Sequence, residues 1–138
     1  YIDINPEVRE WKIPQMIIHT IIENEYKYAV NINQMLTILI KASKADVNGE
    51  EMLYVEVEDD GAGYPKEVLQ FFENQENTIS KTGERVGLKS VKRMMELMYE
   101  REGLFTISNI EPHGCKNTFR IPAHAVQEMK EQKQIKMD

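Results

Sequence analysis

Residues 52–63, MLYVEVEDDGAG, alternate apolar and polar side chains and then break at acidic residues followed by glycines. A period of two is typical of a strand with one buried face. Leu53, Val55 and Val57 share that face with Asp59, so an inward apolar row ends in a carboxylate. A carboxylate there can accept a hydrogen bond from the exocyclic amine of adenine, and the glycines allow close backbone approach. The alternative is a tight acidic turn after a strand.

Three more strands are expected around this one. Residues 34–42 alternate in the same way, and the polar residues 43–51 between the two strands predict a hairpin link. Residues 104–110 and 115–121 form a second pair, joined by a turn at residues 112–114, PHG. The strands therefore come as two pairs.

Helical periodicity marks three other segments. Residues 13 to about 30 predict a helix with Pro14 in its first turn, where a missing N–H does no harm. Two further helices are expected at residues 65–73 and 87–99, separated by polar residues 74–85 that lack periodicity and predict a loop. This order predicts an α/β (α+β) fold in which helices form a layer on one face of a mixed sheet.

The first predicted helix carries an amide on its apolar stripe, which consists of Ile13, Ile17, Ile21, Asn24 and Tyr28. The amide oxygen of Asn24 can ligate Mg²⁺, which takes most of its oxygen ligands from phosphates and water. The neighbouring Glu23 can orient or deprotonate a nucleophile. Lys27, one turn later, can reach phosphate oxygens as a point charge. A capped or solvated asparagine and a solvated lysine are the alternatives.

A third candidate site lies at residues 83–88, GERVGL, where the predicted loop meets the last helix. The free N–H groups and the dipole of a helix N-terminus suit a phosphate. Only Gly83 and Gly87 are glycines in this stretch, so the pattern is a weak phosphate-binding signal when taken alone.

Composition predicts one domain and argues against a nucleic-acid surface and a membrane span. Its 138 residues and 41% hydrophobic content suit a single core. The net charge of −6 argues against a nucleic-acid surface, and the single cysteine, Cys115, fits a reducing compartment. No apolar run is long enough for a membrane span, so we expect a chain without direct membrane contact. A start at Tyr1 without an initiator methionine is expected of a piece of a larger protein.

The order of these motifs resembles the GHKL ATPases, and within them the LytS/YesM-like sensor histidine kinases, over residues 13–122. Residues 13–28 are similar to that branch's N box, a helix entered through proline that ends in Glu-Asn-Ala-x-Lys-His. Residues 59–63 resemble its G1 box, and residues 86–93 resemble its G2 box. Residues 114–122 are similar to its closing strand, which ends in Ile-Pro.

The resemblance implies a Bergerat-type ATP-binding fold, a two-layer sandwich of helices on a mixed sheet, with ATP and Mg²⁺ as its ligands. It implies that Asn24 binds Mg²⁺ and nucleotide, that Glu23 acts as the base and that Asp59 recognises adenine. The other nucleotide-binding residues that it implies are Lys27, Gly61, Gly63, Gly87 and Leu88.

Five residues differ from the family's pattern: Glu25 replaces a small residue, Asp60 and Ser90 replace Asn, Cys115 replaces Thr, and Arg85 replaces a glycine of the G2 box. These differences leave ATP binding expected and leave open whether phosphotransfer is retained. Arg85 either impairs approach to the triphosphate, because arginine takes a positive φ only at a cost, or binds phosphate oxygens itself.

By this resemblance, residues 1–122 are expected to be the ATP-binding catalytic domain of a bacterial two-component sensor histidine kinase, followed by a polar tail at residues 123–138. The domain would donate the γ-phosphoryl group of Mg-ATP to a histidine on upstream dimerisation helices, and the parent protein would pass it to a response regulator. None of His19, His113 and His124 fits the acceptor, so the isolated fragment should not autophosphorylate. The expected location is the cytoplasmic end of a membrane-bound sensor.

Three alternatives remain open at this point. The first is a degenerate nucleotide-binding or protein-interaction module without phosphotransfer. The second is a hydrolase of the same superfamily, and the third is a purely structural α/β domain. Calorimetric titration with ATP, with and without Mg²⁺, would separate nucleotide-binding proteins from the structural alternative.

Overall fold

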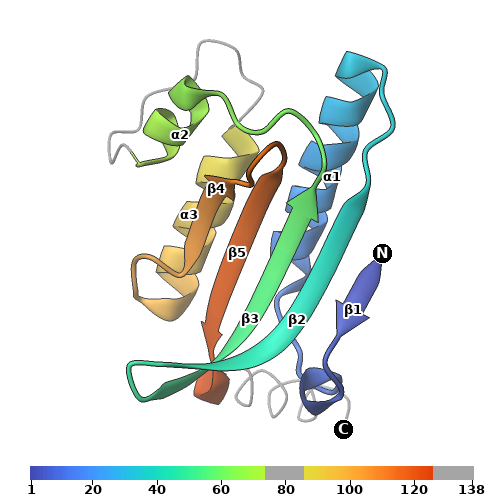
Figure 1. Cartoon of the computed structure of the whole chain (residues 1–138). Helices are drawn as coiled ribbons and strands as arrows, with labels where there is room; N and C mark the ends of the chain where they lie inside the picture. Colours follow the sequence, from blue (N-terminus) through green and yellow to red (C-terminus); the bar gives the residue numbers. More distant parts are fainter. Residues whose placement is uncertain (74–85, 126–138) are drawn as a thin grey trace, which may run out of the picture.

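Five strands form one sheet in the order β1-β2-β3-β5-β4, and helices cover one of its faces (Figure 1). The computed structural model of the chain describes residues 1–73 and 86–125. Its elements are β1 (Ile2–Ile4), the 3₁₀ helix η1 (Pro6–Val8), α1 (Gln15–Ile32), β2 (Ile38–Val47), β3 (Glu50–Asp59), α2 (Lys66–Glu73), α3 (Val86–Tyr99), β4 (Phe105–Asn109) and β5 (Cys115–Pro122). β1 is parallel to β2, and the other neighbouring strands are antiparallel. The predicted fold of helices on a mixed sheet is confirmed.

The hairpin of β2 and β3 turns at Asn48 and Gly49, whose φ angles of 53° and 84° are both positive. Two positive φ angles are typical of the type I′ turn that closes a two-residue hairpin. The prediction that residues 43–51 form a link was wrong in its extent, because residues 43–47 continue β2 and pair with β3. Most of these residues are exposed, so no apolar alternation marks them as a strand.

The two N-terminal elements, β1 and η1, have no counterpart in the hydrophobic pattern. All three residues of β1 are exposed, and backbone hydrogen bonds hold this strand against β2. η1 is capped by Asn5, whose Oδ1 accepts a hydrogen bond from the backbone N–H of Glu7 at 3.0 Å, and it buries Val8. A strand exposed on both faces carries no periodic signal, which explains why the sequence does not predict it.

α1 and α3 lie on the same face of the sheet and pack their apolar stripes against it (Figure 1). On α1, Ile17 and Ile21 are buried as predicted. α3 buries three residues at helical spacing, Leu88, Val91 and Met95. Met98, which was expected to extend that row, is 46% exposed. At 100° per residue Met98 and Tyr99 lie on opposite shoulders of the stripe, and of the two it is Tyr99 that contacts the core.

α2 is joined to α3 through the aromatic residue near its C-terminal end. The ammonium group of Lys92 donates a hydrogen bond to the backbone carbonyl of Phe72 at 2.7 Å and lies 4.8 Å from the centre of its ring. Phe72 meets Phe105 edge to face at 5.4 Å, and Phe105 stacks on Phe119 at 4.6 Å. One row of aromatic rings therefore connects α2 to the sheet.

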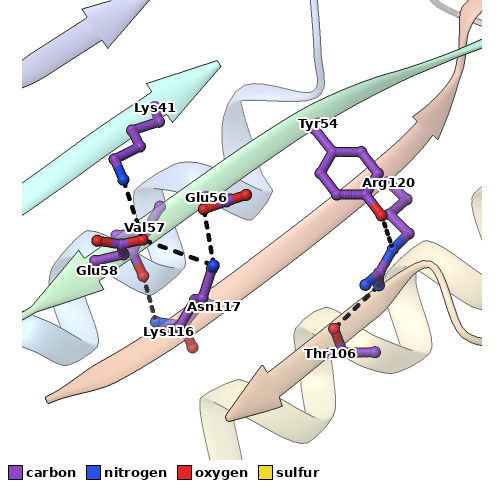
Figure 2. Close-up of polar contacts among 9 residues, drawn as sticks. All are labelled: Lys41, Tyr54, Glu56, Val57, Glu58, Thr106, Lys116, Asn117 and Arg120. Carbon is purple, nitrogen blue, oxygen red and sulfur yellow. Dashed lines mark hydrogen bonds and ion pairs between the residues drawn. The ribbon is translucent and has the colours of Figure 1, made fainter. Parts of the chain in front are cut away.

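The other face of the sheet is lined by polar side chains that pair across strands (Figure 2). Lys116 lies 3.1 Å from a carboxylate oxygen of Glu56, and Lys41 lies 3.4 Å from one of Glu58. Arg120 also donates a hydrogen bond to the hydroxyl oxygen of Tyr54 at 2.8 Å. The sheet is thus amphipathic, as a two-layer fold requires.

Parts of the sequence prediction fall outside the described residues. The predicted loop at residues 74–85 lies there entirely, and residues 126–138 of the predicted tail lie there too. The domain boundary at residue 122 stays a prediction, although β5 ends at Pro122. Across residues 1–73 and 86–125, no helix combines the length and the apolar character that crossing a membrane demands.

Candidate functional site

Asp59 is the last residue of β3, which is paired on both sides by β2 and β5. Its side chain is only 6% exposed. The Oδ1 atom accepts hydrogen bonds from the backbone N–H groups of Gly61 at 2.9 Å and Cys115 at 3.3 Å. Two backbone donors, one in the loop after β3 and one at the start of β5, therefore fix the orientation of this carboxylate, and they engage only one of its two oxygens.

Two glycines allow the backbone to approach Asp59 closely. A Cβ atom at Gly61 would lie 3.2 Å from Asp59 Oδ1 and 3.4 Å from the ring of Tyr28 on α1. At Gly114, with a φ of 120°, a Cβ atom would collide with the carbonyl oxygen of Asp59. Gly61 was expected to allow the backbone to approach a base, and its close approach to Asp59 is a finding of the structure. Gly114 is recognisable only once β5 is placed beside β3.

Gly63 lies against another part of the structure. Its φ is 94°, and a Cβ atom there would lie 3.0 Å from Asn109 Oδ1 at the end of β4. That amide oxygen accepts a hydrogen bond from the backbone N–H of Tyr64 at 2.6 Å, and its nitrogen donates to the carbonyl of Tyr64 at 3.0 Å. Gly63 thus has a structural reason to be glycine, and its contact with nucleotide stays a prediction.

Asn24 on α1 meets the first turn of α3. A Cβ atom at Gly87 would lie 2.7 Å from Asn24 Nδ2 and 2.9 Å from its Oδ1. The Nδ2 atom is buried and has no hydrogen-bond partner among the residues that the structure describes. Leu88, the next residue of α3, is buried beside it. The predicted N-box and G2-box residues therefore touch each other, and only a glycine leaves room for the asparagine.

A small pocket lies between α1, the end of β3 and the start of α3. It is lined by Ile21, Asn24, Glu25, Tyr28, Asp59, Tyr64, Leu88 and Cys115. The cavity volume is about 10 Å³, which is room for about one water molecule. Three predicted site residues, Asn24, Asp59 and Leu88, converge on this pocket from three different elements.

Glu23 and Lys27 lie on the solvent side of α1. Their side chains are 50% and 69% exposed, and Lys27 Nζ lies 3.6 Å from Glu23 Oε1. His19 Nε2 lies 3.9 Å from the other carboxylate oxygen of Glu23. Neither Glu23 nor Lys27 lines the pocket. Each directly precedes a residue that does line the pocket, Asn24 or Tyr28. The predicted roles of Glu23 as base and of Lys27 as phosphate ligand stay predictions.

Asp60, the unusual residue of the G1 box, connects two loops. Its Oδ1 accepts a hydrogen bond from the backbone N–H of Thr37 at 2.8 Å, which ties the segment after α1 to the end of β3. The carbonyl oxygen of Asp60 lies 3.0 Å from Nδ1 of His113. An asparagine at this position could accept the same bond from Thr37, so the change leaves this contact available.

Tyr64 is a pocket residue that the sequence does not single out. It is 5% exposed, and its hydroxyl donates a hydrogen bond to Oδ1 of the fully buried Asn117 at 2.5 Å. The nitrogen of Asn117 donates in turn to the carbonyl of Val57 at 3.2 Å (Figure 2). This network fixes Tyr64, which lines the pocket, to the sheet. Its one visible signal is a polar Asn117 at an inward position of an otherwise apolar strand.

Glu25, one of the departures from the family's pattern, is a buried pocket residue, 6% exposed. Arg85, the other departure near the site, lies outside the described residues together with Gly83. Ser90 is exposed on α3. The two readings of Arg85 therefore stay open.

The donor set around Asn24 fits an ion that brings most of its own ligands. In the described part of the chain, no three His, Cys, Asp or Glu side chains gather to hold a metal. Asn24 offers one amide oxygen, which lies with the amide nitrogen beside Gly87. Mg²⁺ bound by phosphate oxygens and water needs only one such protein ligand, whereas a metal held by protein alone would need more.

Comparison with known proteins places the chain in a family and agrees with its fold. The family described as "Histidine kinase-, DNA gyrase B-, and HSP90-like ATPase" matches residues 12–125. The chain is 28% identical to the sensor protein LytS of Enterococcus faecalis over 123 residues, which are 87% of this chain and 20% of that protein. The chain thus spans about a fifth of the curated relative's length.

Two solved structures share the fold. One is the crystal structure of full-length ShkA in complex with AMPPNP, with a TM-score of 0.57 and 21% identity, covering 88% of this chain and 25% of that one. The other is the NMR structure of the histidine kinase domain of the E. coli osmosensor EnvZ, with a TM-score of 0.52 and 23% identity, covering 88% of this chain and 73% of that one. At these identities the likeness concerns the fold.

Proposed function

The chain belongs to the family of histidine kinase-, DNA gyrase B- and HSP90-like ATPases, and from that premise we propose that it is the catalytic ATP-binding domain of a two-component sensor histidine kinase. It acts as a transferase that gives the γ-phosphoryl group of Mg-ATP to a histidine on a dimerisation region upstream, from which a response regulator receives it. The convergence of Asn24, Asp59 and Leu88 on one pocket supports this proposal best. The longer protein that contains this chain is a sensor whose kinase region faces the cytoplasm.

Each residue has a role that its surroundings allow. Asp59 keeps one carboxylate oxygen for the adenine amine while Gly61 and Cys115 hold the other. Asn24 supplies the amide oxygen for Mg²⁺, and Gly87 gives it room. When bound, Mg²⁺ neutralises charge on the phosphates, which is the main requirement of phosphoryl transfer.

Glu23 and Lys27 act at the edge of the pocket, where both side chains reach solvent. Glu23 is the base that orients or deprotonates the acceptor histidine. Lys27 places a positive charge on a flexible side chain near the phosphates. The helix N-terminus at Val86 and Gly87 offers backbone N–H groups to the same phosphates.

Titration of the chain with ATP tests this proposal through Asp59→Asn. The asparagine keeps an oxygen for Gly61 and Cys115 but replaces the other oxygen by an amide that donates, so it opposes the adenine amine. We expect the affinity for Mg-ATP, measured by calorimetry, to fall at least about tenfold, since losing such a bond costs about 1.5–3 kcal/mol. Omitting Mg²⁺ should weaken binding to the parent chain as well.

The matched control is Glu58→Gln. Glu58 is the preceding residue of β3 and lies on the opposite face of the sheet, beside Lys41. The substitution Glu58→Gln removes one negative charge near the same end of β3, as Asp59→Asn does, but outside the pocket. Equal affinity of the parent and Asp59→Asn for ATP would exclude the adenine assignment, and absence of any ATP binding to the parent would exclude the proposed function.

One observation favours a second function, that of a degenerate nucleotide-binding or protein-interaction module without phosphotransfer. The pocket holds a buried carboxylate, Glu25, and has room for about one water molecule. A module of this kind would bind ATP weakly and would not phosphorylate a histidine. Phosphotransfer to the upstream region of the longer protein separates the two functions.

A further inference from the structure

Asn117 is a fully buried amide on the inward face of β5, and the roles proposed above do not use it. The other inward residues of this strand carry a thiol or an apolar side chain, and they are Cys115, Phe119 and Ile121. A buried amide costs free energy unless both of its ends are hydrogen-bonded, whereas an apolar residue would fill the same place without that requirement. Asn117 does not line the pocket, but it contacts a residue that does, Tyr64. The amide therefore calls for an explanation beyond packing.

The bonds of Asn117 fix the direction of the Tyr64 hydroxyl. The carbonyl oxygen of Val57 can only accept, so the amide nitrogen of Asn117, which donates to it at 3.2 Å, must face β3 (Figure 2). The amide oxygen then faces Tyr64 and accepts its hydroxyl proton at 2.5 Å. A hydroxyl has only one proton to donate. The proton of Tyr64 is therefore directed into the core, and its ring is tied at the hydroxyl end to two strands of the sheet.

The main chain of Tyr64 is held as well as its ring. Asn109, at the end of β4, accepts a hydrogen bond from the N–H of Tyr64 at 2.6 Å and donates one to its carbonyl at 3.0 Å. Strand β5, which holds the ring, also holds Asp59 through the backbone N–H of Cys115 at 3.3 Å. Asp59 and Tyr64 both line the pocket. One strand thus fixes the proposed adenine-binding carboxylate and an aromatic side chain of the same pocket.

We propose that Asn117 is a positioning residue of the nucleotide pocket, which holds the ring of Tyr64 in place for a base bound at Asp59 without touching the base itself. The proposal rests on the proposed function and adds a residue to the same site. A side chain that is fixed before binding does not have to be ordered by the ligand, which preserves affinity. A purely structural Asn117 would affect the free energy of unfolding and leave the affinity of the folded chain for ATP unaltered.

The experiment titrates the whole chain with Mg-ATP by calorimetry, at a temperature at which each variant is folded. Asn117→Leu keeps the size of the side chain and removes the acceptor, so the Tyr64 hydroxyl meets an apolar group and the ring is displaced. We expect the affinity for ATP to fall about threefold to tenfold, the effect of ordering one side chain on binding. Thr118→Val changes the next residue of β5, which is also buried, and should leave the affinity unchanged.

Tyr64→Phe breaks the same bond from the other side and leaves the amide oxygen of Asn117 against an apolar ring. It should lower the affinity for ATP by a similar factor. Tyr99→Phe, which removes a buried hydroxyl outside the pocket, should not. The variant that carries both Tyr64→Phe and Asn117→Leu has two apolar partners in place of the bond, a replacement that can be nearly neutral. We therefore expect it to recover the affinity of the unmodified chain to within about twofold.

The recovery in the double variant is the result that a structural role would not produce. Unaltered affinity in both single variants, or a double variant that binds ATP no better than Asn117→Leu, would overturn the positioning role while the proposed function stands. If Asn117→Leu does not fold, a double variant that binds no better than Tyr64→Phe overturns the positioning role in the same way. Absence of ATP binding to the unmodified chain would overturn the proposed function, and the positioning role with it.

Discussion

The hydroxyl of Tyr99, in the last turn of α3, is buried and has no hydrogen-bond partner within residues 1–73 and 86–125. Burial raises the pKa of this phenol to about 12. We expect Tyr99→Phe to be neutral or to stabilise the fold by up to about 1 kcal/mol at pH 7, because it removes a polar group that the folded state leaves unpaired. Urea unfolding measures this change.

The same substitution has a pH dependence with a definite sign. Tyrosine in the unfolded chain ionises near pH 10, whereas folded Tyr99 keeps its proton to about pH 12. The unmodified chain therefore loses folding stability as pH rises above about 10 towards about 12, and Tyr99→Phe does not undergo this loss. The gap between them should widen from pH 9 to pH 11. Tyr26→Phe, at a side chain that is 69% exposed, should show no such gap, and a constant gap for Tyr99→Phe would contradict the assignment.

At the scale of single residues, the sequence predicted Asn24 and Asp59 as site residues, but it did not predict that Glu25 and Tyr64 line the same pocket. Asn24 stands out because it is polar within an apolar row, and Asp59 because it is polar at the end of one. Such a break in periodicity is visible without a structure. Glu25 gives no such signal, because it lies between an expected polar residue and a tyrosine. Its burial depends on how closely α1 approaches β3, which is a tertiary property.

At the scale of elements, α2 is held to α3 by a side-chain contact from Lys92. Lys92 donates to the carbonyl of Phe72 near the C-terminal end of this short helix. Lys92→Met keeps the length of the side chain and removes the donor, and we expect it to destabilise the fold by about 1–2 kcal/mol. Hydrogen exchange should increase in residues 66–73 more than in β3, because the lost bond holds the helix and not the sheet.

Lys66→Met is the control for this prediction. Lys66 is exposed at the start of α2, so its loss should leave exchange in the helix nearly unchanged. Equal protection of α2 in the parent and in Lys92→Met would mean that the aromatic contacts of Phe72 alone hold the helix in place.

The elements were predictable where one face is buried. α1, β3 and α3 each carry an apolar row against the core, and their predicted bounds differ from the structure by only a few residues. β1 was missed, and the end of β2 was mistaken for a link, because both are exposed and are held by backbone hydrogen bonds. Backbone pairing depends little on side-chain type, so these strands leave no pattern in the sequence.

For the whole molecule, we expect that the 138-residue chain will not label itself with phosphate from radiolabelled ATP and Mg²⁺. By the proposed function, the acceptor histidine lies on the upstream region. His19 and His124 are exposed, and His113 contacts the carbonyl of Asp60 in a turn. The longer protein, with the region upstream, should become labelled, and chelation of Mg²⁺ should prevent it. Acid-labile label on any of these three histidines in the short chain would contradict the prediction.

The order β1-β2-β3-β5-β4 places the strand that ends in Asp59 in the middle of the sheet. A mechanical load applied to β1 at one edge is spread over the ladders of β2 with β1 and with β3, and a load applied to β4 is spread over the ladders of β5 with β4 and with β3. The anchor of the pocket is therefore partly insulated from tension at either edge. The opposite wall is built by α1 and α3, which touch each other at Asn24 and Gly87 with no strand between them. Force transmitted along these helices is the kind that would change the shape of the pocket.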